Sequence, residues 1–245
     1  MQIDVQVIET FLVFCRIAGC LIPVPGLSTA RVPTRIRLFL AVVLAFAAAP
    51  LIDLGQRPTD GSGAGLLWLV VGESVTGAAF GLISRLFIEA LECAGTAISH
   101  YIGLSGISGS IDGDEPVPAI ANGLAILGTL LLFILELPQV LVVKLVESYD
   151  TIPLGRYLDA DALMRHFGRI IAPAFMMGLQ ISAPFLVYGV VLNVMFAILG
   201  RLVPQISAYF VSAPFIAFGG LLLLYLSVGE MVRVLVVSFR MDVLR

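Results

Sequence analysis

Two long stretches without a charged residue constrain this chain more than any other feature of its sequence. One is Ile170–Gly200 and the other is Leu202–Gly229, and neither contains Asp, Glu, Lys, Arg or His. About 20 consecutive apolar residues are enough to cross the hydrocarbon core of a bilayer. Both stretches exceed that length, so they predict membrane-type helices and exclude an ordinary soluble fold.

The composition of the whole chain agrees with this conclusion. Hydrophobic residues make up 59% and charged residues 13% of the 245 residues, and the mean hydropathy is +1.05. Soluble domains contain about 25% charged residues. The 14 cationic residues are scattered and the net charge is −3, so no basic surface tracks a phosphate backbone. A soluble globule, a disordered chain and a nucleic-acid-binding protein are therefore excluded.

Shorter apolar runs at about 5–22, 38–52, 66–88 and 117–143 bring the number of apolar segments to six. Several contain residues that lipid-facing helices avoid, because a charge at the bilayer centre costs at least ~2.5 kcal/mol and a proline removes a helix hydrogen bond. These residues are Arg16, Glu73, Arg85, Glu136, Pro50, Pro138, Pro173, Pro184 and Pro214. We expect an all-α protein of kinked helical hairpins that are buried in protein more than in lipid.

A short motif occurs twice near the C-terminus. Ser182–Phe185 reads Ser-Ala-Pro-Phe, and the same four residues return at Ser212–Phe215. Each copy is followed by an aromatic residue and a glycine, and Gly200–Gln205 provides a break between them. The pattern predicts a hairpin of two similar helices, whereas the alternative is a chance recurrence in a sequence of low diversity.

The sequence offers no pattern that is typical of catalysis. His100 and His166 stand alone, and Cys15, Cys20 and Cys93 do not have the spacing of a zinc or haem site. We therefore expect no enzymatic activity, no metal and no cofactor.

A glycine-rich segment between apolar helices is a candidate for a mobile element. In Gly103–Gly113, glycine and serine alternate with Leu104, Ile107 and Ile111. Irregular backbone at membrane depth is tolerated only where it is buried in protein or lines water. The segment fits a plug inside a cavity, although a surface linker with incidental apolar residues remains the alternative.

The third apolar run contains residues spaced by four. They are Glu73, Gly77, Gly81, Arg85 and Glu89. Small residues four apart let helices approach closely, and Arg85 with Glu89 has the spacing of a helix ion pair. The stripe predicts a helix face that packs against protein, and the alternative is an ion or proton path along its charged members.

Over residues 11–229 the chain resembles the FliR proteins of the flagellar export gate, which are relatives of the SctT subunit of injectisomes. The resemblance rests on the order and spacing of many short motifs. They are Phe11–Gly19, Pro25, Val32-Pro33-x-Arg35-x-Arg37, Pro50, Glu73, Gly77, Gly81, Glu89, Gly95, the glycine-rich segment, Ser148, Pro153, Gly200-Arg201-x-x-Pro204-Gln205, Tyr209-Phe210, Pro214 and Gly219-Gly220. Ser207 departs from the Asn or Pro that the family often has there.

This resemblance implies a single FliR/SctT-like domain over residues 1–245 and the role of a non-enzymatic subunit of a type III protein export gate. The implied location is the bacterial inner membrane at the flagellar basal body. The implied partners are FliP-family and FliQ-family subunits, other membrane proteins of the export apparatus, and unfolded substrates in transit. In such a helical complex the hydrophobic helices are tilted and kinked, and the glycine-rich loop closes the channel.

Carried over by position, the resemblance implies two sets of site residues. The plug comprises Gly103, Leu104, Ser105, Gly106, Ile107, Ser108, Gly109 and Ile111. The interhelical or intersubunit contacts comprise Arg16, Arg35, Glu73, Gly77, Gly81, Arg85, Glu89, Arg201, Pro204 and Gln205. The alternatives are an injectisome gate subunit, a small-solute or ion transporter built on the paired Ser-Ala-Pro-Phe helices, and an intramembrane enzyme.

Overall fold

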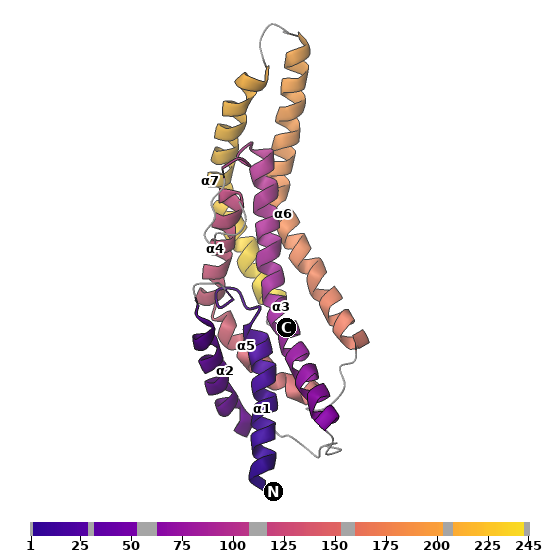
Figure 1. Cartoon of the computed structure of the whole chain (residues 1–245). Helices are drawn as coiled ribbons and strands as arrows, with labels where there is room; N and C mark the ends of the chain where they lie inside the picture. Colours follow the sequence, from indigo (N-terminus) through magenta and orange to yellow (C-terminus); the bar gives the residue numbers. More distant parts are fainter. Residues whose placement is uncertain are drawn as a thin grey trace. The chain divides into compact units, whose positions relative to one another are not determined.

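The computed structural model describes residues 2–28, 32–52, 63–107, 117–152, 160–202 and 208–242, and the statements below concern these residues (Figure 1). Within them the fold is helical, as the sequence predicts. In chain order the elements are α1 (Gln2–Leu21), α2 (Thr34–Ala48), the short 3₁₀ helix η1 (Ala49–Leu51), α3 (Gly63–Tyr101), α4 (Ala119–Ile134), α5 (Leu137–Thr151), α6 (Ala160–Leu202) and α7 (Ala208–Asp242).

The helices confirm a membrane-type protein but not the simple count of six apolar segments. Among the described residues, four helices are long and apolar enough to cross a membrane, or five if the broken pair α4 and α5 forms one span. α3 has 39 residues and α6 has 43, which corresponds to roughly 58 Å and 65 Å of helix. Both helices are thus about twice as long as a hydrocarbon core of ~30 Å is thick.

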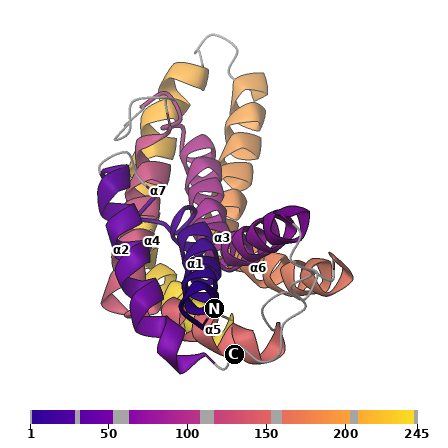
Figure 2. The same ribbon diagram turned by 60° about the horizontal axis from the view of Figure 1, so that its bottom comes forward.

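The chain forms two compact units, each described here by itself. The first contains residues 1–86 and 132–170. In it α1 lies with α2 on one side and the start of α3 on the other (Figures 1 and 2). Apolar side chains from α1, α2 and α5 form its core. They are Val13, Ile17, Cys20, Leu21, Ala41, Ala45, Ala48, Leu141, Leu145 and Tyr149, together with Val24 after α1.

The second unit contains residues 87–131 and 171–245, and so includes the C-terminal part of α3 from residue 87 onward. Glycines bring neighbouring helices close to α3. A Cβ on Gly95 would lie 2.5 Å from the Cα of Ala121 in α4, and one on Gly178 of α6 would lie 2.9 Å from the carbonyl oxygen of Ala90. Backbone contacts of this kind are typical of helices that pack through small residues.

Local backbone chemistry explains where two of the helices end. The amide of Leu104 bonds the carbonyl of Ser99 at 2.9 Å, and Gly103 has φ +74°. This is the Schellman arrangement, in which a left-handed glycine stops a helix. α4 and α5 are separated at Leu135 and Glu136, and Pro138 then occupies the first turn of α5, a position where its missing N–H costs nothing.

Three other prolines lie inside continuous helices. Pro173 and Pro184 are within α6, and Pro214 is within α7. The predicted break over 200–205 falls where α6 ends and before α7 begins. The third apolar run, 66–88, lies within α3, which continues beyond it to Tyr101.

Candidate functional site

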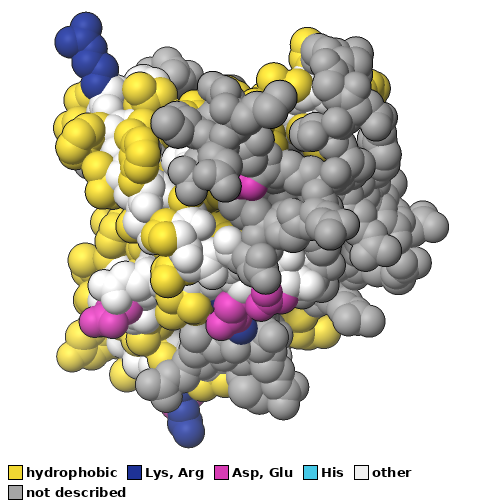
Figure 3. Space-filling model, turned by 90° about the horizontal axis from the view of Figure 1, so that it is seen from below, with side chains coloured by type: hydrophobic (Ala, Val, Ile, Leu, Met, Phe, Trp, Pro, Cys, Tyr) yellow, Lys and Arg dark blue, Asp and Glu magenta, His cyan; other side chains and the backbone are white. Residues whose placement is uncertain are grey.

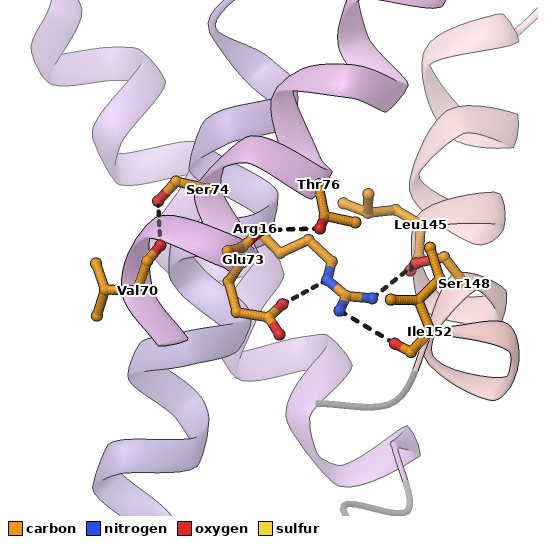
Figure 4. Close-up of polar contacts among 9 residues, drawn as sticks. Arg16, Val70, Glu73, Ser74, Thr76, Leu145, Ser148 and Ile152 are labelled. Carbon is orange, nitrogen blue, oxygen red and sulfur yellow. Dashed lines mark hydrogen bonds and ion pairs between the residues drawn. The ribbon is translucent and has the colours of Figure 1, made fainter. Parts of the chain in front are cut away.

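A buried polar centre in the first unit is built around Arg16, which is fully buried in α1 (Figure 4). Its Nε donates to Oε2 of Glu73 in α3 at 2.5 Å. One terminal nitrogen donates to Oγ of Ser148 in α5 at 3.0 Å, and the other donates to the carbonyl oxygen of Ile152 at 3.2 Å. A single guanidinium therefore joins α1, α3 and the C-terminal end of α5.

An aromatic ring completes the surroundings of this cation. The guanidinium carbon of Arg16 lies 3.7 Å from the ring centroid of Tyr149, a geometry in which the ring face attracts the cation. Glu73 is 4% exposed, so water does little to stabilise either charge. Removing two ions from water is costly unless their bonds are satisfied by good geometry, and here three acceptors and one ring provide it.

The arginine reaches its partners because the backbones of α1 and α3 touch. A Cβ on Gly77 would overlap the carbonyl group of Arg16, and a Cβ on Gly81 would overlap that of Cys20. Gly19 of α1 meets the carbonyl of Ser74 in the same way. In this contact three glycines supply the space, and the Arg16 and Glu73 side chains supply the polar link.

The other predicted contact residues do not join this centre. Arg85 and Glu89 lie farther along α3 and are exposed, as are Arg35 at the start of α2 and Arg201 at the end of α6. The charged members of the predicted stripe therefore lie in different environments. Pro204 and Gln205 lie outside the described residues.

The first part of the predicted plug is described and is tied to helices at both ends. Gly103 caps α3, while the carbonyl of Ile107 accepts a bond from the amide of Ala119 at 2.9 Å. Ser105 and Gly106 are exposed, Leu104 is half-buried, and Ile107 is 58% exposed. Ser108, Gly109 and Ile111 lie outside the described residues.

The two helices that carry the Ser-Ala-Pro-Phe copies are bonded to each other in the second unit. The hydroxyl of Tyr188 in α6 lies 3.0 Å from the carbonyl oxygen of Ile216 and 3.2 Å from that of Phe215 in α7. Gly219 leaves room for this ring, since a Cβ there would overlap the hydroxyl. Tyr188, three residues after the first copy, thus bonds the helix that carries the second.

We expect Tyr188→Phe to lower the stability of the purified chain by about 1 kcal/mol, because one hydrogen bond to a backbone carbonyl is lost while the ring remains. Thermal unfolding in detergent measures this. Tyr225→Phe is the matched control, since Tyr225 is 78% exposed on α7. Equal unfolding temperatures for the two variants would contradict the role assigned to Tyr188.

Sequence reasoning missed three partners of the buried arginine. Tyr149 and Ile152 were outside every motif, and Ser148 counted only toward the family resemblance. The one signal in the sequence is the charge of Arg16 within an apolar segment. Such a charge requires a polar partner, but it does not identify the residue that provides it. In the described part of the chain, no three His, Cys, Asp or Glu side chains come together as a metal site requires.

A comparison with protein families decides the relationship. The model of the family described as bacterial export proteins, family 1, matches residues 7–241. A flagellar biosynthetic protein FliR of Caulobacter vibrioides is 31% identical over 232 residues, which cover 94% of this chain and 92% of that protein. The chain belongs to the FliR family. Its sequence resemblance to these proteins is thereby confirmed.

Other FliR proteins match at similar length. That of Aquifex aeolicus is 28% identical over 90% of this chain and 85% of its own, and that of Escherichia coli is 28% identical over 81% and 76%. As a FliR-family member with several apolar spans, the chain is a membrane protein of the flagellar export apparatus. The injectisome and transporter alternatives are not favoured.

Proposed function

We propose that this chain is a subunit of the flagellar export gate in the bacterial inner membrane at the basal body. It assembles with FliP-family and FliQ-family subunits and other membrane proteins of the apparatus. Together they form the channel through which unfolded flagellar substrates pass. Residues 1–245 act as one functional domain in this assembly, and the chain contributes surface and a plug rather than catalysis.

The observation that carries this proposal is how little of each apolar helix the chain itself buries. In each of the four candidate membrane spans, only 17% to 33% of the most apolar stretch is buried inside the chain. Exposed aromatic residues occur on several of them, including Phe39, Trp68, Phe175 and Phe218, which are 66–74% exposed. Apolar side chains are also spread over the described surface in Figure 3, with few charges among them. Such surface needs lipid or partner subunits to cover it.

The gate requires an element that closes the channel, and the segment after α3 has suitable properties. In its described part, residues 103–107, the Gly103 cap and the bond between Ile107 and Ala119 connect the segment to α3 and α4. The exposed Ser105 and Gly106 add small polar surface, and the exposed Ile107 adds a large apolar side chain. A plug must fill a pore and still move aside, and glycine provides the backbone freedom for that.

We expect deletion of residues 106–109 to leave assembly of the gate largely intact and to make it leak ions. The reason is that the deletion shortens the plug and removes the bond between Ile107 and Ala119, but it leaves in place the glycine contacts that α3 makes with its neighbouring helices. Conductance of membranes containing the gate measures this effect. Deletion of the residues 57–60, which precede α3, is the length-matched control. Unchanged conductance in the 106–109 variant would contradict the plug.

Two alternative functions are separated by simple measurements. The purified chain alone in liposomes moves solute or ions if it is a transporter, whereas a gate subunit without partners does not. Combined substitution of His100 and His166 by alanine tests for enzymatic chemistry, because these are the two histidines of the chain. We expect flagellar assembly to survive this double substitution.

A further inference from the structure

A groove runs between α1 and α2 in the first unit. Its volume is about 510 Å³, and its walls include Phe11 and Phe14 of α1 and Val42 and Phe46 of α2. The rings of Phe11 and Phe14 stack with 6.1 Å between their centroids. Apart from Thr10 the lining side chains are apolar. The groove therefore suits a run of methylene groups better than a polar ligand.

A cation stands in line with this groove. Arg35 is exposed in the first turn of α2, seven residues before Val42. Two residues seven positions apart in an α-helix are separated by about 20° around the helix and by about 10 Å along its axis, so they lie on the same face. Phe39 lies between them on this side and is 70% exposed. One face of α2 thus presents a positive charge followed by apolar surface.

The neighbouring arginine is held in a different way. Arg37 donates to the carbonyl oxygen of Val32 at 3.0 and 3.3 Å. It therefore secures the backbone that leads into α2. Arg35 is the cation that the helix presents on the face of the groove.

The order of charge and apolar surface matches the chemistry of one class of ligand. Residues 34–51 form a helix long and apolar enough to cross a membrane, with Arg35 near its end. Arginines at such ends lie at the headgroup level, where anionic lipids attract them. A phospholipid carries its phosphate and then its acyl chains in this order. A partner helix would also fill an apolar groove, but it would need an Asp or Glu placed to meet Arg35, whereas an anionic phospholipid always carries its phosphate next to its acyl chains.

We propose that the groove between α1 and α2 binds an acyl chain of an anionic phospholipid whose phosphate contacts Arg35. The side chains of Phe11, Phe14, Val42 and Phe46 surround the acyl chain. The lipid then covers apolar surface of α1 and α2 that the chain leaves open. This site does not depend on the export role.

Native mass spectrometry of the purified full chain tests the proposal. Phosphatidylglycerol and phosphatidylcholine with identical acyl chains are titrated in detergent. We expect one phosphatidylglycerol to stay bound per chain, and Arg35→Gln to weaken it about fivefold, toward the affinity for phosphatidylcholine. Val42→Trp fills the groove and abolishes binding of both lipids.

Two matched variants control for general effects on the protein. Arg201→Gln removes an exposed arginine of α6, and Val43→Trp adds the same ring to an exposed position of α2 that does not line the groove. Both should bind phosphatidylglycerol like the wild type. Equal binding by the Val42→Trp and Val43→Trp variants overturns the site, and unchanged binding by Arg35→Gln overturns the phosphate contact. A third outcome also overturns the proposal. If the purified gate complex retains no phospholipid, and if Val42→Trp but not Val43→Trp causes it to lose partner subunits, a partner helix occupies the groove.

Discussion

Arg16→Met lowers the stability of the purified chain by about 3–5 kcal/mol, the cost of removing one partner of a buried ion pair. The variant leaves the Glu73 carboxylate buried without a cation, and it removes the donors to Ser148 and to the Ile152 carbonyl. The unfolding temperature in detergent should fall by roughly 10 °C, and less protein should be recovered from membranes.

The design that isolates the ion pair is a double-mutant cycle. Glu73→Gln alone should also destabilise the chain, because it leaves Arg16 without a counter-charge. Arg16→Met combined with Glu73→Leu should regain much of the loss, since two apolar side chains often replace a buried ion pair at little cost. Arg201→Met is the control for removing an arginine, as Arg201 is exposed. If the double variant is as unstable as the sum of the single variants, the two charges are not coupled.

The second large effect is expected from Gly77→Leu. A Cβ at this position already overlaps the carbonyl of Arg16, so α1 must move away from α3 and the bond between Arg16 and Glu73 must lengthen or break. Overpacking of this kind costs about 1–3 kcal/mol, and occasionally more. Because the atom in the way belongs to the backbone, we expect a loss of stability near the upper end of this range. We also expect less of the chain to be recovered together with its partner subunits.

Gly72→Leu is the matched control for this experiment. Gly72 lies in the same helix, and a Cβ there meets nothing within 4 Å. Both variants replace a helical glycine by leucine, so the gain in helix propensity is the same. The stability difference between them therefore reports the contact with α1. Normal recovery and unchanged unfolding with Gly77→Leu would contradict the close approach.

Much of this architecture was predictable because hydropathy alone identifies membrane-type helices. The positions of helix ends were less accessible. The third apolar run stops at residue 88 because Glu89 and Glu92 follow, whereas α3 continues to Tyr101, since charged side chains that reach the surface do not end a helix. α3 ends where Gly103 can take a left-handed conformation. Gly103 therefore caps a helix, in addition to the plug role expected of its segment.

The centre around Arg16 shows what a single sequence conceals. A charge within an apolar segment reveals that a partner must exist, and Glu73 was a candidate for the same reason. Ser148 is 132 residues from Arg16 in the chain, and no local pattern connects them. Tyr149 attracts the cation through its ring, and the acceptor of Ile152 is a backbone atom that every residue has. Contacts of this kind depend on how helices cross, which periodicity does not determine.

The same contacts impose an order in time on the making of the protein. Arg16 leaves the ribosome 136 residues before Ile152, its most distant partner. At about 5–20 residues per second this delay is roughly 7–27 s. Glu73 follows after 57 residues, but the acceptors of Ser148 and Ile152 are not yet synthesised for most of that interval, so α1 cannot settle into its final position. Until α5 is complete, the remaining donors of this arginine must bond water or another protein.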